Sequence, residues 1–186
     1  MLTRFAAVAA LIALAAPFSV ALGDDPEFQP PPNVKSHILL LAPPREPGRR
    51  MVVTGRLFAP DGKTPRARRH IGAYQTDALG NYGRDPRVPD WARLNGWLRT
   101  DSAGRYEIRT IRPGAYPQRN TPAHIHFVVE TSNGVFDGTM ELQFEDDLLV
   151  SSTKREASRR EGRFGTVRPV RSQRDTLYVE RDLRIR

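Results

Sequence analysis

Three side chains that could bind a metal lie close together in the stretch PGAYPQRNTPAHIHF, residues 113–127. His124 and His126 are separated by one residue within HIHFVVE, a run rich in residues that favour strands. Because side chains alternate across a strand, both imidazoles should project from one face and could give two neutral nitrogen ligands to one ion. A pair of solvent-facing histidines would show the same pattern, so the pair alone leaves both interpretations open.

Tyr116 adds a third candidate ligand. It lies in a loop bracketed by Pro113-Gly114 and Pro117, which restrict the backbone and so fix the direction of the phenol. A phenol ionises at a pH of about 10, so a bound phenolate requires a strongly Lewis-acidic ion such as ferric iron. The chain has no cysteine, which excludes thiolate ligands. Zinc is the alternative ion, although its sites usually draw on Cys, His and carboxylate.

The elements that must position these residues are short strands. From Met51 onward, runs rich in Val, Ile, Tyr, Phe and Thr are separated by the turn sequences PDGK, DALGN, DSAGR and SNG. No segment shows a sustained helical period of apolar residues. The pattern therefore predicts an all-β fold, an antiparallel β-sandwich. The expected strands fall within 51–58, 70–77, 104–111, 124–130, 139–144 and 176–185.

One sequence motif occurs twice. TDALGNY (76–82) and TDSAGRY (100–106) both fit Thr-Asp-x-x-Gly-x-Tyr. The motif predicts a tight turn in which Asp bonds to its own backbone, Gly takes a positive φ and Tyr begins the returning segment. Local physics alone does not distinguish Tyr82 from Tyr106.

The ends of the chain differ in composition from its middle. Residues 1–23 contain an apolar run from Phe5 to Leu22, followed by small and acidic residues, which predicts a signal peptide; a membrane anchor is the alternative. We therefore expect an exported protein, periplasmic or extracellular, free of the membrane after cleavage. Residues 24–50 are rich in proline and predict an extended arm, in which HILLL could dock on the domain. Residues 51–186 form the expected single domain.

The chain is basic, with a formal net charge of +8. Eight Lys and Arg residues lie between Lys154 and Arg174, which would suit an anionic partner or simply a soluble basic surface. The arginines are scattered, no nucleic-acid-binding motif is present, and the protein is expected to be exported. We therefore favour the soluble surface and expect no nucleic-acid partner. The sequence leaves open whether the chain forms a homo-oligomer.

The segment GWLRTDSAGRYEIRTIRPGAYPQRNTPAHIHF resembles the intradiol ring-cleavage dioxygenases of the catechol and protocatechuate type. GRLFAPDGKTP and IGAYQTDALGNYG resemble the same family upstream, so the likeness covers about residues 51–147. Members of that family hold non-haem Fe(III) with two tyrosines and two histidines on a β-sandwich. The resemblance implies Tyr82, Tyr116, His124 and His126 as the ligands, and leaves Tyr106 as a structural strand residue.

The resemblance also implies a reaction. A catechol-type aromatic would chelate the iron and displace Tyr116, which would take up a proton, and O2 would open the ring to a muconate-type diacid without an external reductant. Tyr74 occupies a position that lines the family's active site, although a core aromatic is equally compatible with the sequence. The alternative function is a non-catalytic module that binds ferric iron or catechols.

Two residues depart from the family pattern. Thr121 stands where the family commonly has an arginine that stabilises negative charge on the substrate, and Arg119 or Arg112 could take over that role from a different geometry. Glu141 stands where a glutamine is often found, unless the hairpin at SNG shifts the register. A carboxylate there would oppose an anionic substrate, offer the metal a ligand or simply be solvated. The loop between Tyr116 and His124 is also short, which predicts an open pocket.

Overall fold

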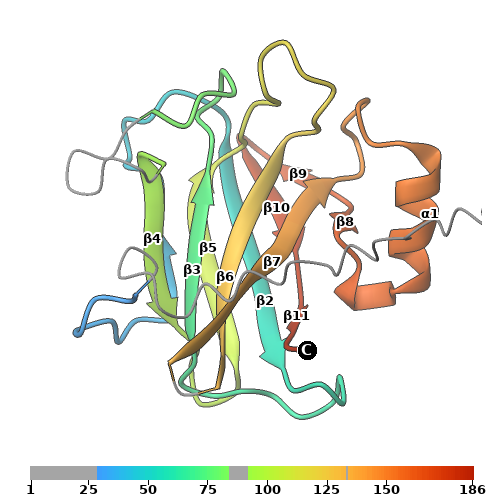
Figure 1. Cartoon of the computed structure of the whole chain (residues 1–186). Coiled ribbons are helices and arrows are strands. Elements are labelled where there is room, and N and C mark those ends of the chain that lie inside the picture. Colours follow the sequence, from blue (N-terminus) through green and yellow to red (C-terminus); the bar gives the residue numbers. More distant parts are fainter. Residues whose placement is uncertain (1–28, 84–91, 133) are drawn as a thin grey trace, which may run out of the picture.

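The protein is described by a computed structural model that covers residues 29–83, 92–132 and 134–186. The expected signal peptide, residues 1–23, lies outside the described residues. Two β-sheets stack face to face, and in the described residues one α-helix and a short 3-10 helix, Gly162–Phe164, lie beside them (Figure 1). The predicted all-β sandwich is therefore observed.

The first sheet has six strands in the order β1-β5-β2-β10-β9, with β11 also paired to β2. Their bounds are β1 Ile38–Leu40, β2 Arg50–Phe58, β5 Arg105–Ile111, β9 Arg171–Gln173, β10 Thr176–Glu180 and β11 Leu183–Arg184. The second sheet has five strands in the order β4-β3-β6-β7-β8. Their bounds are β3 His70–Gln75, β4 Leu94–Arg99, β6 His124–Ser132, β7 Val135–Phe144 and β8 Val167–Arg168.

The prediction that the sheets are antiparallel is wrong in part, because both are mixed. β1 pairs with β5 in parallel, β10 and β11 both run parallel to β2, and β7 runs parallel to β8. Parallel neighbours need a crossover between them, and here the chain leaves β7, passes through the helix and β8, and returns its last strands to the first sheet. The alternation of apolar residues along a strand carries no information about the direction of its neighbour.

A helix was not predicted, yet α1 spans Ser152–Arg160. Ser151 caps it by accepting a hydrogen bond from the backbone N–H of Lys154, and Ser158 is its buried residue. The sequence STKREASRR has no apolar stripe, so a search for hydrophobic periodicity misses it. The guanidinium of Arg155 donates to backbone carbonyls of the preceding loop, including that of Asp147. At least one arginine of the basic segment 154–174 therefore stabilises the fold.

The core lies between the two sheets. Met51, Val53 and Leu57 of β2 face it from the first sheet. Ile125 and Phe127 of β6 face it from the second, as do other buried apolar residues of that sheet (Ile71, Ala73, Leu98, Val129, Leu142 and Phe144). Because side chains alternate, the residues between these on β6 must point to the outer face of the second sheet.

Part of the proline-rich arm belongs to the first sheet. Ile38, Leu39 and Leu40 pair with Glu107 to Arg109 of β5, as the expected docking of HILLL requires. Leu41 and Ala42, which follow, are buried. Among the described residues, no helix has the length and apolar character needed to cross a bilayer.

Candidate metal centre

Strand β6 presents both histidines on the outer face of the second sheet, as predicted. His124 is only 5% exposed, and the Nε2 atoms of His124 and His126 lie 2.8 Å apart. Tyr74 of β3 is the direct cross-strand partner of His126, and the two rings stack with centroids 4.5 Å apart. Tyr74, predicted for the substrate pocket, thus packs on a candidate ligand and limits its rotation.

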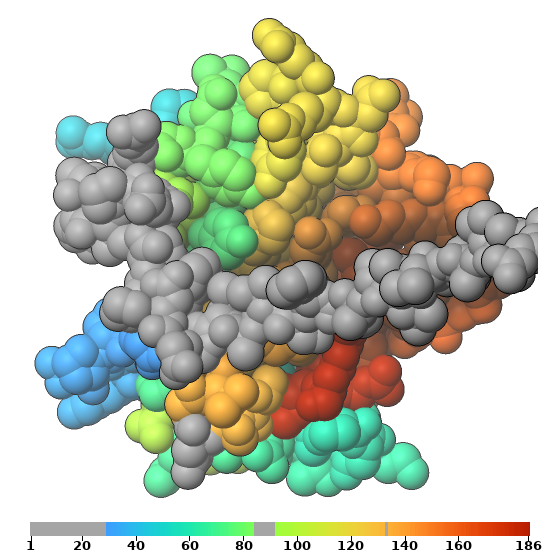
Figure 2. All heavy atoms as spheres, in the orientation of Figure 1, coloured from blue at the N-terminus to red at the C-terminus, as the bar shows by residue number. Residues whose placement is uncertain are grey.

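The two tyrosine-bearing loops are joined through their backbones. The N–H of Gly114 donates to the carbonyl of Asp77 at 2.8 Å, and the hydroxyl of Thr76 donates to the carbonyl of Gly114 at 2.8 Å. At Gly80, a Cβ would lie 1.9 Å from the carbonyl oxygen of Ala115. In the space-filling view the two loops, green and yellow, lie side by side at the upper end of the molecule (Figure 2). This close contact requires glycine and fixes one loop to the other.

Both copies of the Thr-Asp-x-x-Gly-x-Tyr motif form the predicted turn. The carboxylate of Asp77 accepts backbone N–H groups of its own loop, as does that of Asp101, and Gly80 and Gly104 both have positive φ. The tyrosines that follow have different surroundings. Tyr106 is buried in the core, where its hydroxyl donates to the carbonyl of Arg181. Tyr82 lies at the histidine pair.

Four ligand-competent atoms therefore converge on one point. The hydroxyl of Tyr82 contacts that of Tyr116 and lies 3.0 Å from Nε2 of His126. The hydroxyl of Tyr116 lies 3.1 Å from Nε2 of His124. Ligands bound at about 2.0–2.1 Å are separated from one another by about 2.8–3.4 Å when their angles at the ion are between square and tetrahedral. In this four-residue cluster, the three separations that involve a histidine lie in this range, as expected for ligands of a single small ion.

Two observations favour an Nε2 lone pair directed at the cluster, which a histidine ligand needs. Nδ1 of His124 lies 2.7 Å from the carbonyl of Pro122, which only accepts, so Nδ1 carries the proton and Nε2 keeps its lone pair. Burial, together with the electrostatic effect of the adjacent His124 ring, lowers the pKa of His126 to about 4. Burial also raises the pKa of Tyr82 above its ordinary value, as does the hydrogen bond with Tyr116. Without a cation, Tyr82 therefore stays protonated.

Glu141 lies at the edge of this cluster. The β6–β7 pairing places it directly opposite His126. Its carboxylate is about one-third exposed and lies 3.8 Å from Nδ1 of His126. The Oδ2 atom of Asp147, which sequence reasoning missed, accepts the N–H of Ala123 at 2.8 Å and fixes the start of β6. A backbone-directed contact of this kind leaves no signal in residue spacing.

The two candidate arginines differ in their surroundings. Arg112 makes a two-point ion pair with Asp146, at 2.8 and 2.9 Å, and its guanidinium lies over the ring of Phe144. Arg119 is exposed and follows Tyr116 in the loop. Thr121, in the place of the family's arginine, is half-buried. The structure thus brings together Tyr74, Glu141 and the four candidate ligands, and places Arg119 on the exposed part of the loop.

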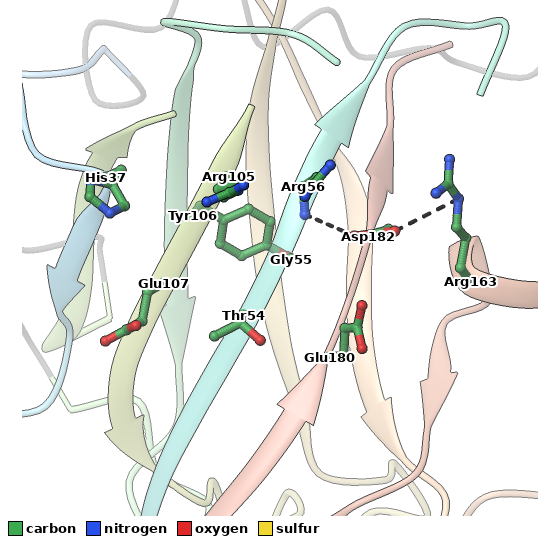
Figure 3. A pocket seen from close by; sticks show the side chains of 10 residues that line it. All are labelled: His37, Thr54, Gly55, Arg56, Arg105, Tyr106, Glu107, Arg163, Glu180 and Asp182. Atoms are coloured by element: carbon green, nitrogen blue, oxygen red, sulfur yellow. Dashed lines mark hydrogen bonds and ion pairs between the residues drawn. The ribbon is translucent and has the colours of Figure 1, made fainter. Parts of the chain in front are cut away.

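A hollow in the described part of the molecule lies away from this cluster. It has a volume of about 390 Å³ and lies on the first sheet, where side chains of β2, β5 and the C-terminal strands surround Gly55 (Figure 3). Its lining has mixed charges, with Arg56 and Arg105 beside Glu107 and Glu180. It contains none of the candidate ligands. The chemistry of the side chains, and not cavity size, identifies the site.

A protein-family model described as Dioxygenase matches residues 24–174. Curated relatives include catechol 1,2-dioxygenase 2 of Acinetobacter lwoffii, 34% identical over 45% of this chain and 36% of the relative. The beta chain of protocatechuate 3,4-dioxygenase of Burkholderia cepacia is 38% identical over 43% of this chain and 38% of the relative. The chain belongs to the intradiol dioxygenase family. It spans less than half the length of these two relatives.

Solved structures of intradiol dioxygenases share the fold. The dioxygenase domain of a carbohydrate-binding fusion protein from Streptomyces sp. SirexAA-E aligns with a TM-score of 0.60 at 23% identity, over 87% of this chain and 94% of that one. An intradiol ring-cleavage dioxygenase from Tetranychus urticae aligns with a TM-score of 0.58 at 21% identity, over 82% and 86%. At these identities the likeness establishes the sandwich architecture.

Proposed function

We propose that the chain binds non-haem Fe(III) and cleaves a catechol-type aromatic ring with O2 between its two hydroxyl-bearing carbons. The observation that supports this is the convergence of four candidate ligands, Tyr82, Tyr116, His124 and His126. Their hydroxyl oxygens and Nε2 atoms lie within hydrogen-bonding distance of their neighbours in the cluster. Two phenolates and two neutral imidazoles leave ferric iron one residual positive charge, which suits a doubly deprotonated diol. Family membership supports the same reaction class.

The bound ion would supply Lewis acidity, which holds the diolate and withdraws electron density from its ring. The chain's own residues have simpler tasks. Tyr82, His124 and His126 hold the ion, and the stacked ring of Tyr74 keeps His126 in place. The diol loses two protons as it binds, of which the phenolate oxygen of Tyr116 would accept one and a hydroxide the other. In the overall reaction one diol and one O2 give one diacid. Both oxygen atoms of O2 enter the product, so the reaction consumes no reductant.

A second function, non-catalytic binding of ferric iron or of a catechol, is favoured by the departures from the family pattern. Thr121 cannot provide the positive charge of the arginine it replaces, and Arg112 is paired with Asp146. Glu141 adds a negative charge beside His126. A site with these features retains all four candidate ligands but stabilises developing anionic charge on the substrate less well.

We also propose that the protein acts outside the cytoplasm after removal of residues 1–23, with small catechols and O2 as its partners. The apolar run from Phe5 to Leu22 supports export. The scattered arginines support a soluble basic surface without a nucleic-acid partner. Assembly into a homo-oligomer would be measured by sedimentation.

The first test is the colour of the purified protein after loading with ferric iron. Charge transfer from phenolate to ferric iron should give a red or purple band. Tyr82→Phe and Tyr116→Phe should each shift or remove it, whereas Tyr178→Phe, at a half-exposed tyrosine of β10, should not. A wild-type protein that binds no ferric iron would refute both the proposed enzyme and the proposed iron-binding module.

Oxygen uptake then separates the two functions. Stoichiometric O2 consumption with catechol, and a product with the absorbance of a muconate-type diacid, identifies the enzyme. A coloured protein that shows no uptake with a panel of substituted catechols is the non-catalytic module.

A further inference from the structure

The two candidate histidine ligands have different partners on the side of the ring away from the cluster. Nδ1 of His124 faces the carbonyl of Pro122 at 2.7 Å. Nδ1 of His126 faces the carboxylate of Glu141, with Oε1 at 3.8 Å. A metal-bound histidine almost always donates its second ring N–H to a carboxylate, a carbonyl or water, which fixes its tautomer and its orientation. His124 therefore has its acceptor, and the carboxylate of Glu141 lies just beyond hydrogen-bonding distance of His126.

The sheet register places Glu141 next to His126. In the β6–β7 pairing His126 is opposite Glu141, and His124 is opposite Gln143. Residues directly opposite each other share a face of the sheet, with Cβ atoms about 4.5–5.5 Å apart. The backbone carbonyl of Glu141 also accepts a hydrogen bond from Nε of the buried Arg181 at 3.0 Å. The backbone of Glu141 is thus fixed, and its side chain stays within reach of His126.

The carboxylate of Glu141 is oriented by Gln143. Nε2 of Gln143 donates to Oε2 of Glu141 at 3.2 Å. Because a carboxylate only accepts, the amide must present its NH2 group to it, and Oε1 of Gln143 is then left buried without a hydrogen-bond partner in the described residues. A buried acceptor of this kind costs free energy. The amide of Gln143 therefore orients the carboxylate of Glu141, although its own oxygen is left without a hydrogen bond in the described residues.

Glu141 could instead be a ligand of the ion itself. The ligand atoms of His124, His126 and Glu141 lie within 4.8 Å of one another, which would allow a carboxylate ligand. However, Nε2 of His126 is the atom that faces two of the other candidate ligands, His124 and Tyr82. The two nitrogens of one imidazole point in divergent directions, so a carboxylate beside Nδ1 lies on the side of the ring away from an ion at Nε2.

We infer that Glu141 is a positioning residue that accepts the Nδ1–H of His126 when the ion is bound. This inference rests on the proposed ferric site. The part-exposed carboxylate must move by about 0.6–1.1 Å, from 3.8 Å to a hydrogen-bonding distance of about 2.7–3.2 Å. The contact holds the lone pair of His126 at Nε2 and makes the ring a stronger donor, which tightens ferric iron binding and lowers the Lewis acidity of the ion.

The test compares Glu141→Gln and Glu141→Leu with the wild-type protein, using Glu145→Gln as a control. Glu145 pairs with Arg159 on the surface, so its variant removes the same charge away from the cluster. Ferric iron affinity is measured by competition with a chelator, and the visible band is recorded for each protein. We expect Glu141→Leu to lose affinity about 10- to 100-fold. Glu141→Gln keeps an acceptor and should lose less, while its band moves to longer wavelength because His126 donates less strongly.

Unchanged affinity and an unchanged band in Glu141→Leu would overturn the inference. The inference would also be overturned if the variants changed only the ratio of the KM for carboxylated catechols to the KM for uncharged catechols. Glu141 would then contact the substrate and not His126. Failure of the proposed function is seen separately, in the unmodified protein, as the absence of ferric iron binding.

Discussion

Gly80→Ala tests whether contact between the two tyrosine-bearing loops builds the metal site. A Cβ at this position would lie 1.9 Å from the carbonyl oxygen of Ala115, and real Cβ contacts are essentially never below 3.0 Å. The two loops must therefore separate by roughly 1 Å, whereas ligand distances in a metal site tolerate about 0.2 Å. We expect ferric iron affinity to fall at least about tenfold, a loss of roughly 1.4 kcal/mol or more in binding free energy.

Gly104→Ala is the matched control, because Gly104 occupies the same place in the second copy of the turn. The φ angles of Gly80 and Gly104 are 86° and 73°, so both variants carry a left-handed alanine that costs about 1–2 kcal/mol. The nearest atom to a Cβ at Gly104 is 3.0 Å away and belongs to Leu57, in the core strand β2. Both variants should lose stability in urea denaturation, and only Gly80→Ala should lose its visible band. Wild-type iron affinity in Gly80→Ala would refute the reasoning.

Two further predictions concern stability. Asp147→Ala removes the acceptor of the buried N–H of Ala123 and should cost about 1–3 kcal/mol in urea denaturation, more than Asp146→Ala on the surface, and equal losses would contradict this. Burial alone would raise the pKa of Glu130, but hydrogen bonds from the backbone and ring of His70 lower it below its ordinary value of 4.5. A lowered pKa contributes stability that is present above the ordinary value and lost as the pH falls through the folded value. Glu130→Gln should therefore flatten the fall in the urea midpoint between about pH 5 and pH 3, and an unchanged slope would show that Glu130 does not contribute.

The parts of the site that depend on local geometry could be predicted from the sequence. Alternation along β6 is a local rule, so a shared face for His124 and His126 followed from their spacing. Tyr82 and Tyr106 follow identical turns, and only the family resemblance separated them. The physical difference is non-local, since Tyr106 enters a strand that pairs with β2, whereas Tyr82 lies outside the strands, next to the second tyrosine loop.

Two other features depend on contacts that residue spacing does not record. Helix α1 buries one serine and is held by a cap and by arginine contacts with carbonyls, so it lacks an apolar period. The position of Glu141 opposite His126 depends on two irregularities in the β6–β7 pairing, between Phe127 and Val129 and between Glu130 and Ser132. A count along the hairpin cannot locate such shifts.

The position of β10 has a consequence for the order of folding. Thr176–Glu180 lies between β2 and β9, and Leu177, Val179 and Leu183 complete the core beneath β2. The first sheet therefore cannot form completely until residues 176–185 have been synthesised, because β10 pairs with β2, a strand much earlier in the sequence. Loops this long close slowly and leave the edge of β2 exposed in the meantime. A chain halted before residue 176 should expose that edge and aggregate, however complete its four candidate ligands are.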